Sequence, residues 1–399
     1  MMNLDQSALR AAYSRFLVKD RVLLSGHSHQ AWPDVVRDAL GRFFDDSAAF
    51  VDDKWMEVIF PKIDAVGGAI LDRMGFDPGD PIVFGRSTQE LVFRLLTSLP
   101  LFQADRAAAR VRIVTTSAEF HSLRRQLSRL AEEGVEVVWV DAQPREALPD
   151  RLLAAITPGT SVVALSSVFF EDAYIVPRLD EILARAAAVG AIPLVDAYHS
   201  FNVVPIAWGG ARDSLYVTAG SYKYAGFGEG LCWLRFPRDC ALRPVDTGWF
   251  ADFSALGAAP GAGPVTYGSG GARFAGATFD ASPIYRAEAA LAHWDRFGLT
   301  VPRLRAISLH QTRRILDRID ARGLAATLVS SRDDDRRGGF VTLRVARATE
   351  AVAALRARGV FVDSRQDLLR IGPAPYVTDD EIDRGTDLIA GVVEELARS

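Results

Sequence analysis

Short apolar runs alternate with amphipathic stretches through the middle of the chain. Runs typical of buried strands cover residues 81–84, 111–115, 135–140, 161–165, 192–195 and 215–218. Stretches with helical spacing of their apolar residues lie between them, for example at 89–99, 123–133 and 180–189. Strands that are apolar on both faces must be covered on both faces, and helices are the usual cover. The pattern therefore predicts a mostly parallel sheet between two layers of helices.

The pattern changes after Asp246. Residues 255–276 are rich in Gly, Ala and Pro, which predicts a long loop. Beyond the loop, helices are predicted at 284–297, 301–322, 349–358 and 379–396, and strands at 341–345 and 368–371. The fold class predicted is α/β, with a large domain over 46–298 and a smaller C-terminal α/β domain over 299–399. Residues 1–45 are predicted to pack across both domains.

Composition narrows the function classes. Of 399 residues, 49% are hydrophobic and 24% charged, which is usual for a soluble globular protein. The net charge of −4 disfavours a nucleic-acid binder. No apolar run approaches the roughly 18 residues of a membrane helix, and the first twenty residues lack a signal-like apolar stretch. Two cysteines provide neither a disulfide framework nor metal-ligand spacing, so we expect a cytoplasmic protein.

Lysine is rare in this chain. It occurs only at positions 19, 54, 62 and 223, whereas arginine supplies nearly all other positive charge. Arginine stays protonated and cannot act as an amine nucleophile. The isolated Lys223 therefore suggests a chemical role rather than a surface charge.

Polar and aromatic residues follow several of the predicted strands. Ser87 and Thr88 precede a helix, where two hydroxyls and helix N-terminal amides suit a phosphate, although such residues are also usual N-caps. Phe120, Ser166 and Asp196 follow three further strands. Because ligands bind at the carboxyl ends of the strands in open α/β sheets, we expect these side chains to share one site.

Lys223 follows the last predicted strand of the large domain, next to Tyr222 and a glycine-rich stretch at 226–230. A buried lysine can lose its proton and attack an aldehyde. A phosphate cup, a stacking ring, an anion for a pyridinium nitrogen and an amine for a Schiff base together suit one ligand. That ligand is pyridoxal phosphate.

Two motifs at the predicted cofactor site resemble motifs of a known enzyme family. Asp196-Ala197-Tyr198-His199 is similar to an Asp-Leu-Ala-His motif whose Asp pairs with the pyridine nitrogen, and Ser221-Tyr222-Lys223-Tyr224 matches a Tyr-Lys-Tyr motif that holds the Schiff-base lysine. Over essentially its whole length the chain resembles the kynureninase branch of the class V aminotransferase-like, fold-type I pyridoxal-phosphate enzymes. The resemblance implies cofactor contacts for Ser87, Thr88, Phe120, Ser166, Asp196, His199, Tyr222 and Lys223.

Further motifs bear on the partner subunit and the substrate. Gly248-Trp249-Phe250 resembles the family's Gly-Trp-Phe-Gly, whose Trp holds phosphate from the neighbouring subunit, so a homodimer is implied. Arg370 begins a run similar to Arg-x-x-x-x-Pro-Leu-Tyr, whose Arg binds the substrate α-carboxylate. Asp363 and Arg365 stand where the family carries Asp-x-Arg. The activity implied is hydrolytic Cβ–Cγ cleavage of an α-amino acid.

The chain departs from the family around the expected substrate pocket. His27 and His29 replace residues of an Asp-Gly-Asn-Ser-Leu-Gly motif, Glu171 is one of two carboxylates after a buried strand, and Glu229 lies in the glycine-rich turn. We expect His27 to contact the substrate. The cofactor frame is predicted to be kept while the substrate preference has changed toward a more polar side chain.

Other functions stay open at this point. Transamination or lyase chemistry on another amino acid is the close alternative, and a catalytically inactive binding protein is a further one. A cysteine desulfurase is disfavoured because no cysteine follows Cys240. A nucleotide-dependent oxidoreductase is disfavoured because neither glycine-rich run has the strand, G-x-G-x-x-G, helix order. No metal site is predicted, since the sequence gives His27 and His29 no acidic or thiol partner.

Overall fold

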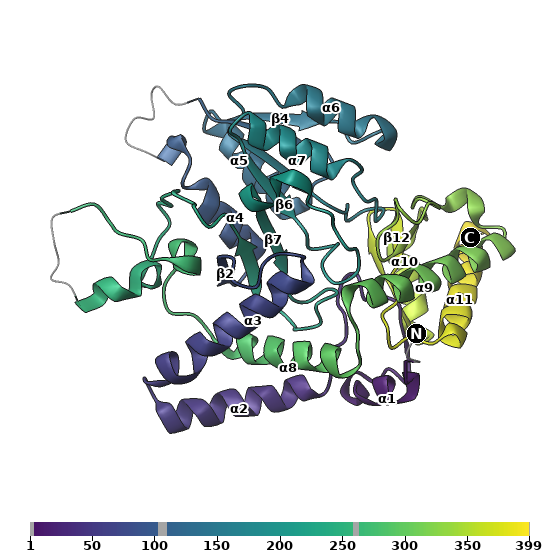
Figure 1. Cartoon of the computed structure of the whole chain (residues 1–399). Coiled ribbons are helices and arrows are strands. Elements are labelled where there is room, and N and C mark those ends of the chain that lie inside the picture. Colours follow the sequence, from purple (N-terminus) through teal and green to yellow (C-terminus); the bar gives the residue numbers. More distant parts are fainter. Residues whose placement is uncertain (1–3, 103–109, 258–262, 399) are drawn as a thin grey trace.

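A seven-stranded sheet forms the centre of the computed structural model, which describes residues 4–102, 110–257 and 263–398 (Figure 1). The strand order in the described chain is β2-β8-β7-β6-β5-β3-β4. The strands are β2 (Ile82–Gly85), β3 (Arg112–Thr116), β4 (Glu136–Val140), β5 (Val162–Ser166), β6 (Ile192–Asp196), β7 (Tyr216–Gly220) and β8 (Cys232–Arg235). β8 is antiparallel to both neighbours, and the remaining pairs are parallel. The predicted α/β fold class is confirmed.

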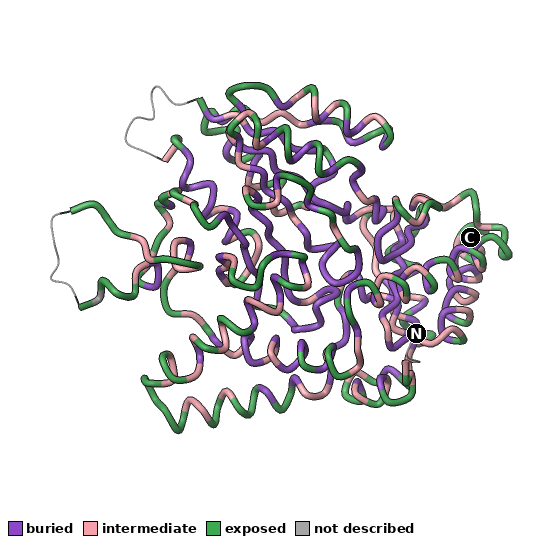
Figure 2. Tube along the Cα trace, in the orientation of Figure 1, coloured by how far each residue is buried: buried purple, intermediate pink, exposed green. Residues whose placement is uncertain are grey.

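Helices cover both faces of this sheet because successive strand residues point to opposite faces. In β5, Val162 and Ala164 join a core with α4 (Thr88–Leu96) and α5 (His121–Glu132). Val163 and Leu165 join the opposite core, which includes residues of the remaining large-domain helices. Those helices are α3 (Phe60–Arg73), α6 (Leu148–Ala155), α7 (Leu179–Ala188) and α8 (Ser282–Arg296). Figure 2 shows the buried strands at the centre of the molecule.

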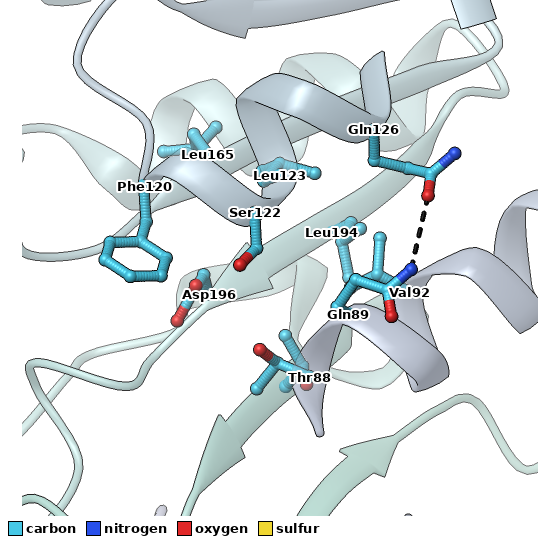
Figure 3. Close-up of a pocket in the computed structure, with 11 residues that line it drawn as sticks. Thr88, Gln89, Val92, Phe120, Ser122, Leu123, Gln126, Leu165, Leu194 and Asp196 are labelled. Atoms are coloured by element: carbon cyan, nitrogen blue, oxygen red, sulfur yellow. Dashed lines mark hydrogen bonds between the residues drawn. The ribbon is translucent and has the colours of Figure 1, made fainter. Parts of the chain in front are cut away.

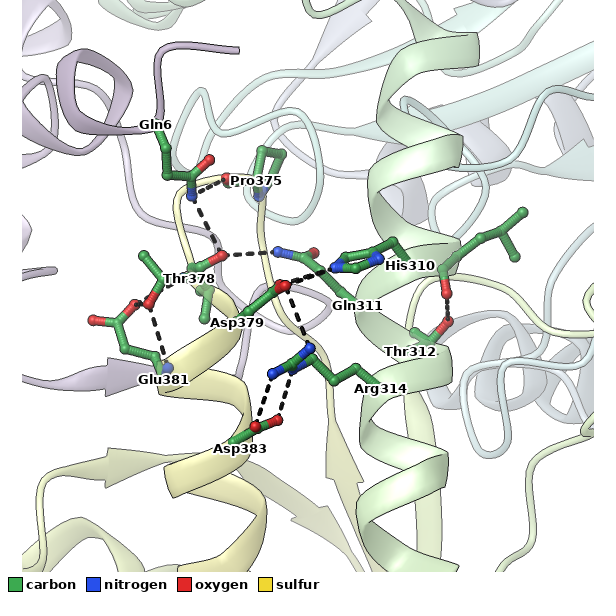
Figure 4. Close-up of polar contacts among 12 residues, drawn as sticks. Gln6, His310, Gln311, Thr312, Arg314, Pro375, Thr378, Asp379, Glu381 and Asp383 are labelled. Carbon is green, nitrogen blue, oxygen red and sulfur yellow. Dashed lines mark hydrogen bonds and ion pairs between the residues drawn. The ribbon is translucent and has the colours of Figure 1, made fainter. Parts of the chain in front are cut away.

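A smaller α/β unit follows α8. Its sheet has the order β11-β12-β9, with both pairs antiparallel. The strands are β9 (Val341–Arg344), β11 (Asp363–Arg365) and β12 (Leu368–Ile371), and the helices are α9 (Val301–Ala321), α10 (Ala348–Ala357) and α11 (Asp379–Arg398). The segment after β12 is fixed from two sides, because Gln6 and Gln311 donate to its backbone carbonyls (Figure 4).

The N-terminal segment connects the two units. It includes α1 (Gln6–Ala11), and its strand β1 (Val22–Leu23) pairs in parallel with β10 (Val360–Phe361) of the small unit. The Gly26 amide then donates to the Gly372 carbonyl, and the Gln30 amide donates to the Tyr222 carbonyl beside Lys223. Helix α2 (Val35–Phe50) continues onto the large unit, where it packs against α8.

Several sequence expectations differ from the structure. β8 was not predicted, because its four residues follow a glycine-rich turn and show no alternation. The loop predicted over 255–276 contains a short 3₁₀ helix at Gly270–Phe274, and its residues 258–262 lie outside the described residues. Helix α2 is continuous across residues 45 and 46, so the predicted domain limit there does not coincide with the end of an element. None of the described helices is long and apolar enough to cross a membrane.

Candidate active site

A cavity of about 270 Å³ opens at the carboxyl ends of the parallel strands. Eight residues that the sequence singled out for the cofactor line it together: Ser87, Thr88, Phe120, Ser166, Asp196, His199, Tyr222 and Lys223. They come from segments up to 136 positions apart in the chain. The strands β2, β7, β6, β5 and β3 all run in one direction, because β2 and β7 are both antiparallel to the β8 strand between them, so their carboxyl ends meet at one edge. The structure therefore assembles a single site from these side chains.

Lys223 is the buried amine of this cavity. Its side chain follows β7, and Nζ lies 2.9 Å from Nε2 of His199 and 4.2 Å from the ring centroid of Tyr198. Burial lowers the pKa of Lys223 to about 7, although the nearby Asp196 carboxylate opposes that shift. A substantial fraction of the amine is therefore neutral near pH 7, and a neutral amine can attack an aldehyde.

Asp196 ends β6 and faces the same space. Its Oδ1 accepts a hydrogen bond of 2.8 Å from the Tyr198 amide, and burial raises its pKa while Lys223 opposes that rise. Figure 3 shows Asp196, Phe120, Ser122 and Thr88 around a narrow extension of the cavity between α4 and α5. The extension is bordered by Gln89, whose amide donates to Gln126 at 3.3 Å. A carboxylate in this position can pair with a ring nitrogen that carries a proton.

The start of α4 forms another wall. Ser87 is the N-cap, and its Oγ accepts a hydrogen bond of 3.1 Å from the Glu90 amide. Thr88 is the first helical residue, and the exposed Arg86 precedes the cap. Hydroxyls, the positive end of a nine-residue helix and a nearby guanidinium are suited to bind a phosphate group.

Sequence reasoning missed one buried carboxylate, Glu119. It accepts hydrogen bonds from the Ser166 hydroxyl at 2.6 Å, the Ser166 amide at 3.0 Å and the Thr116 hydroxyl at 2.6 Å. Burial raises the pKa of Glu119 to about 7, although these hydrogen bonds favour the charged form. The only sequence signal was its place between a strand and Phe120. Glu119 fixes the orientation of the Ser166 hydroxyl beside Asp196.

The two residues expected to bind substrate, Arg370 and His27, are buried and do not line the cavity. Arg370 donates from Nε to Oδ1 of Asp363 at 2.9 Å and from Nη2 to Oδ2, and His27 Nε2 lies 2.8 Å from the same Oδ1. Burial lowers the pKa of His27 to about 4, so its neutral ring donates this hydrogen bond at pH 7. Neither Arg370 nor His27 lines the cavity. The sequence did not predict Asp363 as their shared partner.

The other departures from the family fall into two groups. Glu229 lines the cavity, and its Oε1 lies 3.2 Å from Nε2 of His29, which stacks on Tyr222. Glu171 is half-buried and does not line the cavity. Its neighbour Asp172 forms a buried ion pair with Arg145. Of these departures, only Glu229 lines the cavity directly, and His29 borders it through Glu229 and Tyr222.

Trp249 lies away from the cavity of its own chain. Its indole Nε1 donates to Thr278 Oγ1 at 3.2 Å, and its ring packs on Phe250 with a centroid distance of 4.2 Å. The side chain is partly exposed on the large unit. Across the described ranges, no cluster of three or more His, Cys, Asp and Glu residues is arranged to hold a metal ion.

Comparison with solved structures defines the class of fold. An apo cysteine desulfurase from Thermococcus onnurineus NA1 aligns over 99% of both chains, with a TM-score of 0.78 and 16% identity. A C-DES variant with glycine covalently linked to its PLP cofactor aligns over 96% of this chain and 98% of that chain, with a TM-score of 0.77 and 17% identity. The chain has the fold-type I architecture of pyridoxal-phosphate enzymes.

Sequence comparison narrows the class. The kynureninase C-terminal domain model matches residues 304–389. Kynureninase of Pseudomonas fluorescens is 26% identical over 341 residues, which are 82% of this chain and 78% of that protein. The uncharacterized aminotransferase YcbU of Bacillus subtilis (strain 168) is 23% identical over 94% of this chain and 95% of its own. The resemblance to kynureninase-like, class V pyridoxal-phosphate enzymes that the sequence motifs predicted is therefore confirmed.

Proposed function

We propose that this chain binds pyridoxal phosphate through Lys223 and cleaves the Cβ–Cγ bond of an α-amino acid by hydrolysis. The observation that supports this most directly is a buried amine with a pKa near 7 in a cavity that also contains a carboxylate, a helix N-terminus and aromatic rings. The cofactor, when bound, withdraws electrons from the substrate Cα. The residues of the chain bind and orient the cofactor and the substrate, and they transfer protons.

The residues at the cavity fit this cofactor. Ser87, Thr88 and Tyr222 would hold its phosphate, Phe120 would cover its ring, and Asp196 would pair with the ring nitrogen. Within the described residues, His199 Nδ1 is buried without a hydrogen-bond partner, so a polar group beside Lys223 is available to a ligand. Ser166 would add a hydroxyl whose orientation Glu119 fixes.

Lys223 would then act as the acid and base at the substrate Cα. Its pKa near 7 lets it gain and lose a proton with little free-energy cost at physiological pH. His199 holds Nζ at 2.9 Å, and burial keeps the pKa of His199 well below its usual range, so the imidazole is neutral. The imidazole accepts from the protonated amine and thereby orients it.

The β11–β12 hairpin would bind the substrate carboxylate. Arg370 donates from Nη1 to the carbonyl of Phe170 at 2.6 Å, and the Phe170 ring lines the cavity, so this hairpin borders the site. Arg370 supplies a fixed positive charge, and His27 stabilises that arrangement through Asp363. Glu229 and His29 would face the substrate side chain from the other wall.

Transamination is the second candidate. It is favoured by the match to YcbU, which spans more of this chain than the match to the Pseudomonas fluorescens kynureninase. Both reactions begin with proton removal at Cα, and they differ in where the proton next goes. The residues described above serve either reaction up to that point.

Trp249 would complete the site of a second copy of this chain. Its ring is partly exposed, and Phe253, also partly exposed, lies 5.4 Å from it between ring centroids. An apolar, partly exposed pair of this kind suits an isologous homodimer contact. The cofactor phosphate would then be held by residues of both subunits.

A substrate panel on the purified holoenzyme tests the reaction. L-kynurenine, 3-hydroxykynurenine and common amino acids are offered, with alanine release and keto-acid formation measured separately. We expect alanine release from one substrate with a polar side chain, and kcat/KM on L-kynurenine below about 10⁴ M⁻¹s⁻¹. Keto-acid formation without alanine would overturn hydrolysis in favour of transamination. Efficient cleavage of L-kynurenine would refute the changed pocket.

A further inference from the structure

The buried carboxylate of Glu119 is hydrogen-bonded to the wall of the cavity. The residue is 2% exposed, lies between β3 and α5, and does not itself line the cavity. Its Oε2 accepts from the Ser166 hydroxyl at 2.6 Å, and its Oε1 accepts from the Thr116 hydroxyl at 2.6 Å. Of these two hydroxyl residues, Ser166 lines the cavity and Thr116 does not. Glu119 is therefore connected to the cavity through Ser166.

The polarity of this connection depends on the charge of Glu119. The Ser166 hydroxyl has a single proton to donate. While Glu119 is ionised, that proton is directed to Oε2, and the Ser166 oxygen offers only lone pairs to the cavity. A protonated Glu119 can instead donate from Oε2 to the Ser166 oxygen, while its Oε1 still accepts from the Ser166 amide at 3.2 Å. The Ser166 hydroxyl is then free to donate into the cavity.

Both protonation states of Glu119 are accessible near neutral pH. Its hydrogen-bond partners at the ends of β3 and β5 are neutral hydroxyls and an amide. The charged group that acts on it from β6 is the Asp196 carboxylate, and His121 at the start of α5 is exposed. Burial raises the pKa of Glu119 to about 7, the hydrogen bonds oppose this rise, and Asp196 adds to it.

Ser166 lies beside the residue that would pair with the ring nitrogen of the cofactor. β5 and β6 pair in parallel, and Ser166 is the register partner of Asp196. Both residues line the cavity. Pyridoxal phosphate carries a hydroxyl group on a ring carbon that a single further carbon separates from the ring nitrogen. A side chain next to Asp196 is therefore suited to contact that hydroxyl.

We propose that Glu119 controls, through Ser166, whether the ring hydroxyl of the bound cofactor keeps its proton. An ionised Glu119 makes Ser166 an acceptor, which favours the protonated ring hydroxyl. A protonated Glu119 makes Ser166 a donor, which favours the deprotonated ring oxygen. Glu119 is a positioning residue, because it acts through Ser166 and does not line the cavity. This inference rests on the proposed function, since it concerns the cofactor of that site.

The visible absorbance of the holoenzyme tests this inference without a turnover assay, because the spectrum of the cofactor changes when its ring oxygen loses a proton. Glu119→Gln keeps the size of the side chain, and its amide can donate to Ser166 at every pH. We expect the variant to bind the ring-oxygen proton about 10- to 100-fold more weakly, the range for a hydrogen bond to a charged group, so the apparent pKa of the bound cofactor falls. An unchanged or raised apparent pKa would overturn the inference.

Ser166→Ala separates the hydrogen bond from the charge of Glu119. If Ser166 transmits the effect, Glu119→Gln should change the proton affinity of the cofactor by less than about 3-fold when Ser166→Ala is already present. An undiminished effect in the Ser166→Ala protein would show that the charge acts directly across the cavity wall, and it would overturn the role of Ser166.

The matched control is Glu171→Gln, the same substitution at a half-buried carboxylate on the segment after β5. Glu171 does not line the cavity. This variant should leave the apparent pKa of the bound cofactor close to that of the wild type. Equal effects of Glu171→Gln and Glu119→Gln would contradict a specific role for Glu119.

The outcomes separate this inference from the proposed function. Failure of Lys223 to retain pyridoxal phosphate after borohydride reduction would overturn the proposed function itself. A holoenzyme labelled at Lys223 whose absorbance titrates alike with and without Glu119→Gln would overturn only the role of Glu119.

Discussion

At the scale of single residues, Lys223 is distinguished from the other lysines by burial. Its side chain is 6% exposed, whereas Lys62 forms an ion pair with Glu288 at 2.6 Å on the large unit. Reduction of the holoenzyme with borohydride, followed by peptide mapping, should place the pyridoxyl label on Lys223. Label on Lys19, Lys54 or Lys62 would contradict the assignment.

Glu119 gives the site a pH-dependent stability. An acid whose pKa rises on folding, here to about 7, binds more protons folded than unfolded, so the free energy of unfolding falls as pH rises from about 4.5 to 7. Glu119→Gln removes the carboxyl group whose deprotonation causes this decrease in the free energy of unfolding. Relative to the wild type, the variant should gain up to about 3 kcal/mol between pH 4.5 and pH 8 in denaturant unfolding.

The exposed Glu57→Gln is the control for this experiment, because its side chain is solvated in the folded and unfolded chain. It should show no comparable pH-dependent gain. Equal pH profiles for the wild type and Glu119→Gln would mean that Glu119 is not held in a buried, protonated state.

Site residues that stand directly at the end of a predicted strand could be predicted from the sequence. Asp196 and Lys223 follow strands, and strand ends meet at one edge of a parallel sheet, so their proximity follows from topology. Glu119 was missed, and the partners of Asp363 were not predicted, because the contacts of Glu119 with Ser166 and of Asp363 with His27 join residues 47 and 336 positions apart that only tertiary packing brings together. The contact of Arg370 with substrate stays a prediction.

At the scale of elements, the sheet requires close approach of Tyr198 to the end of β7. A Cβ on Gly220 would lie 2.4 Å from Tyr198 Oη, and the Tyr198 ring packs over the amine of Lys223. Gly220→Ala should therefore displace the ring, destabilise the fold by about 1–3 kcal/mol and weaken cofactor binding. Thermal unfolding and cofactor titration measure both effects.

Gly210→Ala is the matched control, because a Cβ there meets open space. It should leave stability and cofactor affinity close to those of the wild type. Equal effects of the two substitutions would show that the approach of Tyr198 is not a constraint. The sequence contained no pattern for this contact, since the glycine ends β7 and the tyrosine lies in the turn after β6.

Strands with continuous apolar character were the most predictable elements. β5 and β6 are buried along both faces, so their sequences differ clearly from those of the neighbouring helices. β8 was missed although it is fully buried, because Cys232–Arg235 contains only four residues and ends in an arginine that pairs with Asp80. A short strand of this kind is defined by its neighbours β2 and β7 rather than by its own pattern.

At the scale of the whole molecule, the proposed homodimer depends on the partly exposed aromatic residues around Trp249. Phe253 packs between Trp249 and Phe60 and remains partly exposed. Phe253→Asp should convert a dimer into a monomer in light scattering and weaken cofactor binding, since a charge cannot be buried in an apolar contact without a partner.

Leu17→Asp serves as the control for assembly. Leu17 is also an exposed apolar residue, but it belongs to the N-terminal segment near the small unit. This variant should remain dimeric. A wild-type protein that is a stable monomer and still binds the cofactor tightly would refute the shared site.

The N-terminal segment has a mechanical consequence for the whole molecule. Residues 22–26 are hydrogen-bonded to the small unit, and four residues later the Gln30 amide is hydrogen-bonded to the carbonyl of Tyr222, a residue that lines the cavity and is proposed to hold the phosphate. A displacement of the small sheet must therefore be absorbed within residues 26–30 or transmitted to Tyr222. The end of the site proposed for the substrate carboxylate and the end proposed for the phosphate are thus joined by a stretch of chain only a few residues long, and neither end can move far without the other.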